Sequence, residues 1–133
     1  MYNPGSFGFM PRTISRVPLL SRVKDFTYLA TSMVTVYIRY VLDPAKLAEF
    51  ERYGQLWIPL VEQFGGQHHG YFLPGEGANN IALALFTFGS LAAYERYRQQ
   101  AAQDPACQAA FKFAEDTRCI LSYERSFFRP VFT

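Results

Sequence analysis

Two adjacent histidines, His68 and His69, are the most visible candidates for chemistry in this 133-residue chain. A histidine titrates near neutral pH, so either one facing a cavity can serve as an acid, a base or a polar anchor. Adjacent strand residues point to opposite faces, so the pair cannot chelate one metal ion without a bulge. No further ligand is spaced to help. We therefore expect no metal site. The alternative to a functional histidine is that both histidines are structural or surface groups.

Arg39 and Glu124 form a second candidate pair. They fall in two segments that we expect to be neighbouring antiparallel strands, so the two side chains can meet across the sheet. One interpretation is an ion pair at a subunit interface. The other is a polar patch that orients a small ligand. The face opposite the helices is then predicted to carry Thr35, Tyr37 and Arg39 with Ser122, Glu124 and Ser126.

Aromatic residues supply the third group of candidates. Trp57 with Pro59 indicates either core packing with a helix kink or a pocket wall. Tyr37 and Tyr71 are predicted to line one cavity with their aromatic faces. The candidate ligand-binding residues are Tyr37, Arg39, Trp57, His68, His69, Tyr71 and Glu124, and the weak catalytic candidates are His69, Arg39 and Tyr71.

Several common functions have no signal in the sequence. It contains no nucleophile elbow, phosphate-binding loop or dinucleotide fingerprint, and we expect no cofactor. The net charge is only +2, which argues against a nucleic-acid partner. Tyr94, Arg96, Tyr97 and Arg98 mix aromatic and basic residues on one expected helix. We interpret them as a solvated face with packing tyrosines rather than as an RNA-binding surface.

The elements that position these residues follow the order β-α-β-β-α-β. Strands are expected at 33–42, 67–73, 81–88 and 118–128 from their β-branched and aromatic content. Asp43-Pro44 begins a helix that Pro59 should kink or split and that Gly65-Gly66 ends. Ser90 begins another helix that runs to about Ala102, and Asp104-Pro105 restarts it to near Asp116. Right-handed crossovers then predict a ferredoxin-like α+β fold, an antiparallel sheet of strand order 4-1-3-2 with the helices on one face.

The other face of this sheet should need a cover. The third strand is apolar on both faces, from Ile81 to Phe86, and aromatic residues make up 17% of the chain. A second copy, packed sheet to sheet about a two-fold axis, is the simplest cover. We therefore predict a homodimer with a closed, barrel-like interior.

Residues 1–32 differ in composition from the rest, which leads us to divide the chain into an irregular extension, 1–32, and a domain, 33–133. The extension is basic, acid-poor and rich in proline and glycine. It is interpreted as a loose arm or as the product of an upstream start, with translation beginning at Met33, and alternatively as a mitochondrial leader. The two cysteines, Cys107 and Cys119, are too few for a disulfide scaffold and show no CxxC spacing, which favours reduced thiols and a cytoplasmic location. No apolar run is long enough for a membrane span.

Five short stretches together resemble the NIPSNAP family over about residues 34–132. They are Val36–Phe50 with its Asp-Pro-Ala-Lys helix start, Trp57–Leu60, Phe64–Gly66 with Gly70–Phe72, Asp104–Gln108 and the closing strand Glu124–Pro130. The resemblance implies a ferredoxin-like, dimeric α+β barrel and names no common reaction. Many relatives carry Glu or Arg where this chain has Val36 and Ile38, and Ala45 replaces the usual Gly.

Two functions follow as expectations. The first is a dimeric module that binds a small apolar or aromatic molecule, or a partner protein, without catalysis. The second is a cofactor-independent enzyme of the monooxygenase or isomerase type that uses the barrel interior. Convergent titratable groups in a solvent-reachable pocket would distinguish the enzyme from the binding module.

Overall fold

The computed structural model of the chain describes residues 32–132. In chain order its elements are β1 (Val34–Leu42), the 3-10 helix η2 (Pro44–Lys46), α3 (Leu47–Gln63), β2 (Gln67–Phe72), β3 (Ile81–Phe88), α4 (Leu91–Ala101), α5 (Pro105–Thr117) and β4 (Ile120–Phe128). The expected arm and the question of its start lie in residues 1–31, outside the described part. No helix within residues 32–132 is long and apolar enough to cross a membrane.

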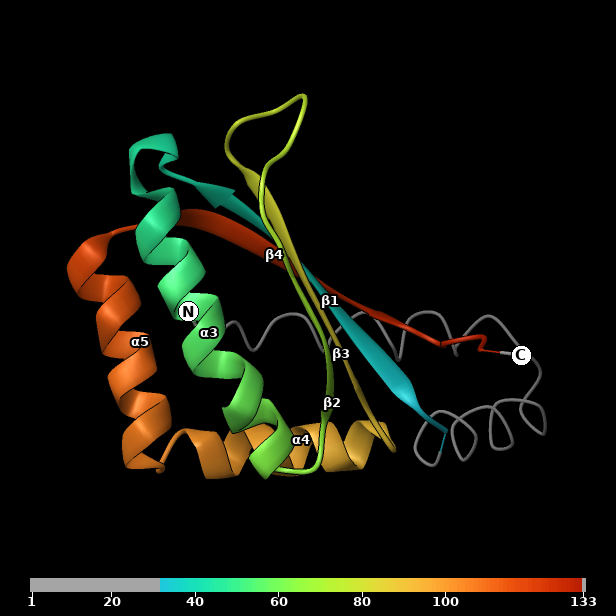
Figure 1. Cartoon of the computed structure of the whole chain (residues 1–133). Helices are drawn as coiled ribbons and strands as arrows, with labels where there is room; N and C mark the ends of the chain where they lie inside the picture. The colour runs from blue at the N-terminus through green and yellow to red at the C-terminus, as the bar shows by residue number, and fades with distance from the viewer. Residues whose placement is uncertain (1–31, 133) are drawn as a thin grey trace.

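The four strands form one antiparallel sheet of order β2-β3-β1-β4. This is the predicted order 4-1-3-2 counted from the other edge, and it confirms the ferredoxin-like α+β fold. In Figure 1 the three α-helices lie on one side of the sheet, with α3 and α5 side by side. The sheet therefore has a covered face, against the helices, and an open face on its other side.

Strict alternation along β1 separates these two faces. Five apolar residues of β1 are buried beneath the helices: Val34, Val36, Ile38, Tyr40 and Leu42. The residues between them belong to the open face and are half-buried. Register partners share a face, so the covered face continues through Ala82, Ala84, Phe86 and Phe88 of β3. The core of the domain is this face together with the inner sides of the helices.

Each helix begins where a short polar side chain caps it. Asp43 Oδ1 accepts from the Ala45 N–H at 2.9 Å, Ser90 Oγ from the Ala93 N–H at 3.0 Å, and Asp104 Oδ2 from the Cys107 N–H at 3.0 Å. The three predicted starts are thereby confirmed, except that Asp43 begins a 3-10 turn and α3 starts at Leu47. These caps satisfy donors that have no partner inside the helix.

Pro59 lies inside α3 without splitting it. A proline removes one backbone donor from a helix. Buried residues on both sides of Pro59, including Tyr53, Trp57 and Val61, pack the two halves of α3 into the same core. The helix therefore continues from Leu47 to Gln63 and ends at Phe64, before Gly65 at φ 95°.

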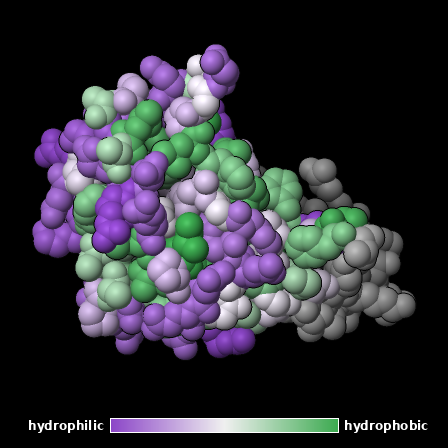
Figure 2. Space-filling model, in the orientation of Figure 1, coloured by the Kyte–Doolittle hydropathy of each residue, from purple (hydrophilic) through white to green (hydrophobic). Residues whose placement is uncertain are grey.

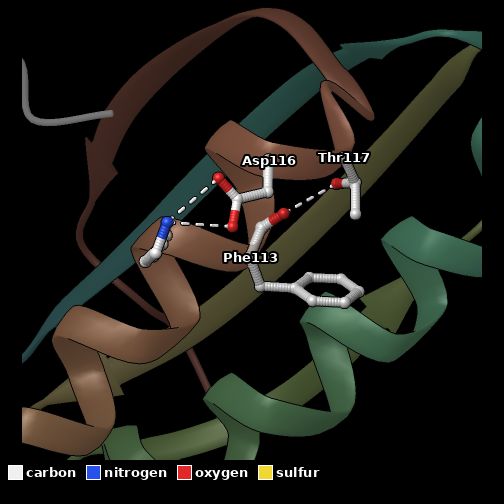
Figure 3. Close-up of polar contacts among 4 residues, drawn as sticks. Phe113, Asp116 and Thr117 are labelled. Carbon is white, nitrogen blue, oxygen red and sulfur yellow. Dashed lines mark hydrogen bonds and ion pairs between the residues drawn. The ribbon is translucent and has the colours of Figure 1, made fainter.

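The C-terminal end of α5 explains why the last strand starts later than predicted. Thr117 Oγ1 donates to the Phe113 carbonyl at 2.8 Å, and Lys112 pairs with Asp116 one turn apart at 3.1 Å (Figure 3). Lys46 Nζ donates to the Thr117 carbonyl at 2.6 Å. Arg118 then takes a left-handed conformation, φ 55°, which stops the helix. Because Arg118 serves as this cap, β4 begins at Ile120 and not at Arg118.

A bulge in β2 changes which face its last residues occupy. His68 pairs with Phe86, but the next pair is Gly70 with Leu85, so His69 is an extra residue on β2. Gly70 has φ 119°, a conformation that side chains other than glycine rarely adopt. The extra residue places Tyr71 opposite Ala84, on the covered face, where simple alternation from His69 would have put it on the open face.

Candidate functional site

The predicted site residues divide between the two faces of the sheet. Trp57, His68 and Tyr71 lie on the covered side, while Tyr37, Arg39, His69 and Glu124 belong to the open side. The prediction that Tyr37 and Tyr71 line one cavity is wrong, and the bulge in β2 is the reason. For the same reason His69, Arg39 and Tyr71 do not converge on one site within the protomer.

Arg39 and Glu124 are direct register partners on β1 and β4, as expected. They do not form the expected ion pair, because the one ion pair among the described residues joins Lys112 and Asp116. The two charges therefore lie side by side on the open face as separate polar groups.

His69 is hydrogen-bonded on the open face. Its Nε2 atom lies 2.7 Å from the Thr87 hydroxyl, and the Thr87 hydroxyl lies 2.7 Å from that of Thr35. His69 and Thr35 border a shallow pocket of about 340 Å³, whose other walls include Tyr37, Leu85 and Phe128. The hydrogen bond to Thr87 fixes the His69 ring as a polar group on an otherwise largely apolar strand surface.

His68 lies on the covered side, in contact with aromatic rings. Its ring stacks on Tyr71 with centroids 5.0 Å apart, and its Nδ1 accepts from the Gly70 N–H at 2.9 Å. Burial, reinforced by nearby His69, lowers the pKa of His68 to about 4. At neutral pH the ring is uncharged, with its proton on Nε2, and it holds the bulge in place. A group with this pKa is a weak base at pH 7.

A second cavity lies between the covered face and the helices. Its volume is about 330 Å³, and every strand and every α-helix contributes to its wall. Aromatic side chains dominate the lining: Tyr40, Tyr53, Trp57, Tyr71, Phe86, Tyr94, Tyr97, Phe111 and Tyr123. A concave, largely aromatic space of this size is typical of small-molecule sites. We call it the aromatic cavity.

The two longest walls come from regularly spaced residues of α3 and α4. Tyr53, Trp57 and Val61 recur every four residues on α3, and Tyr94, Tyr97 and Ala101 recur every three or four on α4. Such spacing places each set on one side of its helix. On the outer side of the helices, hydrophilic residues predominate in the view of Figure 2.

Gly54 lets the Tyr71 ring approach α3 closely. A Cβ atom at position 54 would lie only 2.9 Å from the Tyr71 ring. Tyr71 in turn stacks near Tyr40 and meets Phe50 edge-on, with centroids 6.3 Å and 5.7 Å apart. The missing side chain at Gly54 therefore sets the position of one cavity wall.

The tyrosines of the cavity are neutral hydrogen-bond donors. Burial raises the pKa of Tyr40, Tyr53, Tyr71 and Tyr97 far above the usual value, so all four keep their protons at physiological pH. The Tyr71 hydroxyl donates to that of Tyr40, which offsets part of the rise in the Tyr40 pKa. Phenols in this state bind and orient an acceptor but do not abstract protons at pH 7.

The described residues hold no group of three or more metal-ligating side chains. Cys107 and Cys119 are both buried and carry free thiols. Burial, with Asp104 nearby, raises the pKa of Cys107 to about 12. A thiol in this environment is unreactive at neutral pH, and it belongs to the core rather than to a catalytic site.

Most of the cavity wall was missed from the sequence. The sequence predicts Trp57 and Tyr71 as site residues but gives no signal specific to Tyr40, Tyr53 or Tyr123. Tyr94 and Tyr97 were correctly interpreted as packing tyrosines, whereas Arg98 beside them borders the cavity and is half-buried. The available signal was the four-residue spacing of aromatic residues on the first helix and the high tyrosine count of nine.

Comparison with known proteins supports the fold and leaves the activity open. The NIPSNAP family profile matches residues 35–133. A NIPSNAP family protein of unknown function from Agrobacterium tumefaciens is 20% identical, with 75% of this chain and 89% of that one aligned and a TM-score of 0.65. A NIPSNAP-like domain protein from Burkholderia xenovorans is 18% identical, with coverages of 76% and 87% and a TM-score of 0.62.

A candidate antibiotic biosynthesis monooxygenase from Caulobacter crescentus has the same fold. It is 15% identical, with coverages of 82% and 99% and a TM-score of 0.55. No curated protein matches the sequence. At such identities the solved structures show a shared architecture, and a shared architecture does not carry an activity with it.

Proposed function

Because this chain belongs to the NIPSNAP family, as its match over residues 35–133 shows, we propose that it is a homodimeric α+β barrel protein that binds a small, largely apolar molecule in the aromatic cavity of each protomer. The observation that carries this proposal is the cavity itself. It offers about 330 Å³ walled by rings from every layer of the fold. A filled core would leave no such space.

The wall favours binding over catalysis. Its buried phenols are donors, and no histidine is among the described residues that line it. The alternative of a cofactor-independent enzyme used His69, Arg39 and Tyr71 together, and these residues occupy opposite faces of the sheet. We therefore place ligand binding first.

Native mass spectrometry of the full chain as purified tests the proposal. We expect extra mass from a small molecule, and we expect Ala101→Leu, which fills the cavity from α4, to remove it. Ala92→Leu is the matched control, because Ala92 is exposed on the same helix. Extra mass that survives Ala101→Leu equally well would contradict the proposal.

The homodimer is proposed to form through the open face of the sheet. That face presents Val41, Ile81, Leu83 and Leu85 at its centre and the exposed rings of Phe72 and Phe128 at its edges. An apolar surface of this extent favours association. Sedimentation of the full chain at micromolar concentration should give the mass of a dimer, and a stable monomer would contradict this part of the proposal.

We also propose a cytoplasmic location and the division into an extension, 1–32, and a barrel domain, 33–133. The buried, free thiols of Cys107 and Cys119 support a reducing compartment. Mass analysis of the native amino terminus tests the division. An intact amino terminus at Met1 in the mature protein would contradict both a start at Met33 and a cleaved leader.

A further inference from the structure

Four tyrosines of the aromatic cavity come from four different elements: Tyr40 from β1, Tyr53 from α3, Tyr71 from β2 and Tyr97 from α4. Burial is the largest cause of their raised pKa values, and the electrostatic effect of each phenol on the others adds to the rise. Such an effect weakens with the distance between the charged groups. The four hydroxyls therefore lie near one another, although the rings arrive from different directions.

Two of these hydroxyls have a proton to donate and no protein group to receive it. A phenol donates one hydrogen bond and accepts others. The proton of Tyr71 is used, because the Tyr71 hydroxyl donates to that of Tyr40. Within residues 32–132, the structure shows no acceptor for the proton of Tyr40 or for that of Tyr97. Tyr40 and Tyr97 are therefore the donors that a bound molecule can use.

Both donors lie deep in the protomer. Tyr40 is 3% exposed and Tyr97 is 6% exposed. Buried polar groups in proteins are nearly always hydrogen-bonded, because a buried donor without an acceptor lowers stability. Both side chains belong to the wall of the aromatic cavity, so a molecule inside the cavity can supply the acceptor.

The surroundings of the two donors favour an uncharged acceptor. The pKa of Tyr40 is raised, with burial as the largest cause, even though Arg125 acts in the opposite direction. The pKa of Tyr97 is raised as well, again mainly by burial. A place where a phenol resists becoming an anion is also unfavourable for another negative charge. A carbonyl oxygen is uncharged, accepts two hydrogen bonds and donates none.

From this arrangement we propose that the ligand of the aromatic cavity is an uncharged carbonyl compound with a small apolar body, whose carbonyl oxygen accepts hydrogen bonds from Tyr40 and Tyr97. This inference rests on the proposed function and adds the chemical class of the ligand to it. The apolar body is small because the cavity volume of about 330 Å³ lies near the lower end of known ligand pockets.

Acetophenone and α-methylstyrene are matched probes for the carbonyl oxygen. The two molecules have nearly the same shape, but a CH₂ group replaces the oxygen in α-methylstyrene. The Kd of each probe is measured with the full chain at pH 7 by ligand-observed NMR titration. Because the alkene leaves water more readily than the ketone, the decisive quantity is the change that a substitution causes in each Kd.

Tyr40→Phe and Tyr97→Phe each remove one hydroxyl and keep the ring. Each variant should raise the Kd for acetophenone about fivefold, which corresponds to the loss of one neutral hydrogen bond. The Kd for α-methylstyrene should stay within about twofold of its value in the unmodified protein. The double variant should raise the Kd for acetophenone about 25-fold, and the single variants are sufficient if the double variant fails to fold.

Tyr37→Phe is the matched control. Tyr37 also loses a hydroxyl and keeps its ring, but it lies on the open face and outside the wall of the aromatic cavity. Both Kd values should stay within about twofold. If Tyr37→Phe weakens acetophenone as much as Tyr40→Phe does, the carbonyl oxygen is not held by the cavity phenols and the assignment is overturned.

The remaining outcomes separate this inference from the proposed function. If Tyr40→Phe and Tyr97→Phe leave the Kd for acetophenone unchanged, or raise the Kd of both probes by the same factor, the carbonyl ligand is overturned and the cavity remains a binding site. Ala101→Leu, which fills the cavity, should abolish the binding of both probes. If neither probe binds the unmodified protein, or if both still bind Ala101→Leu, the proposed function fails and the inference fails with it.

Discussion

The covered and open faces of the sheet share their strands but differ in what they can do. On the covered face, alternate residues of β1 meet the rings of α3 and α4 and enclose a cavity of about 330 Å³. On the open face, the residues between them form a flatter surface with the short chain His69–Thr87–Thr35 and the separate charges Arg39 and Glu124. In the function that we propose, one side of each strand faces the ligand and the other side faces the second copy.

Substitutions at two adjacent positions of β3 should give the largest contrast between the two faces. Ala84 is fully buried on the covered face, and Ala84→Glu should lower the free energy of unfolding by on the order of 5 kcal/mol, because an unpaired charge is buried. Chemical denaturation measures this effect.

Leu83→Glu, one residue earlier, is the matched change on the open face. The introduced carboxylate would stand opposite Arg39 in the register, so the fold should survive while sedimentation shows a monomer. A folded dimer of Leu83→Glu would refute the interface, and a well-folded Ala84→Glu would refute the division into faces.

Two tyrosines give the next largest contrast. Tyr71→Ala should lower the free energy of unfolding by about 3 kcal/mol, since it removes a ring in contact with Tyr40, Phe50 and His68. Tyr37→Ala, on the open face with an edge-on contact to Phe128, should lower it by about 1 kcal/mol in a protein kept monomeric by Leu83→Glu. Urea denaturation of both variants measures the difference. Equal losses would contradict the assignment of the two rings to opposite faces.

Gly54→Ala should have a smaller effect that separates packing from helix propensity. The added methyl would lie 2.9 Å from the Tyr71 ring, and overpacking of this kind costs about 1–3 kcal/mol. Alanine is intrinsically better in a helix by about 1 kcal/mol, so the net loss of unfolding free energy should be about 1 kcal/mol. Thermal denaturation tests the loss, and probe binding should weaken with it. A stabilised variant would show that Tyr71 moves freely.

The smallest effect concerns the two histidines and pH. The pKa of His68 is lowered to about 4 by burial, so the unfolded chain takes up a proton at this group near pH 6.5 and the folded protein does so only near pH 4. His68 therefore contributes stability that is complete above pH 6.5 and is lost as the pH falls through 4.

The loss from His68 should amount to on the order of 1 kcal/mol, well below the full linkage value, because the ring is partly exposed to solvent. His68→Asn should reduce the slope of unfolding free energy against pH between 6.5 and 4. His69→Gln, which removes only the smaller of the two causes of the His68 shift, should leave most of that slope in place. An unchanged slope in His68→Asn would show that the ring is solvated in the folded protein.

Local rules were sufficient to predict most of the fold. Asp43, Ser90 and Asp104 predict helix starts, because their side chains can cap free backbone N–H groups. The structure confirms all three. The β-branched and aromatic content of residues 33–42 indicates a strand, and the order of the elements predicts a sheet with the helices on one face. The order of elements then restricts the topology to 4-1-3-2, because crossovers are right-handed. These features depend on residues that are close in the sequence and on the order of the elements, so they can be predicted from the sequence.

The arrangement of the candidate site could not be predicted from the sequence, because it depends on the tertiary structure. The bulge at His69 moves Tyr71 from one face to the other. The one signal for it in the sequence of β2 is Gly70, and a glycine occurs in many other local structures. Arg98 and Arg125 are distant in the chain, and both border one cavity because α4 and β4 contribute to its wall. Likewise, the wall of the cavity combines residues from all four strands and all three α-helices of the described part.

The sequence by itself determined the helix starts, the strand order and the family. Only the tertiary structure decided which aromatic residues surround an empty space and which fill the core. The physical reason is that element formation follows from local hydrogen bonds and periodic burial, whereas a cavity exists only where side chains from distant segments fail to fill the volume between them. Trp57 shows the difference. Its helix and buried side follow from its spacing, while its place in the wall of a cavity depends on Phe111, Tyr53 and every other element around it.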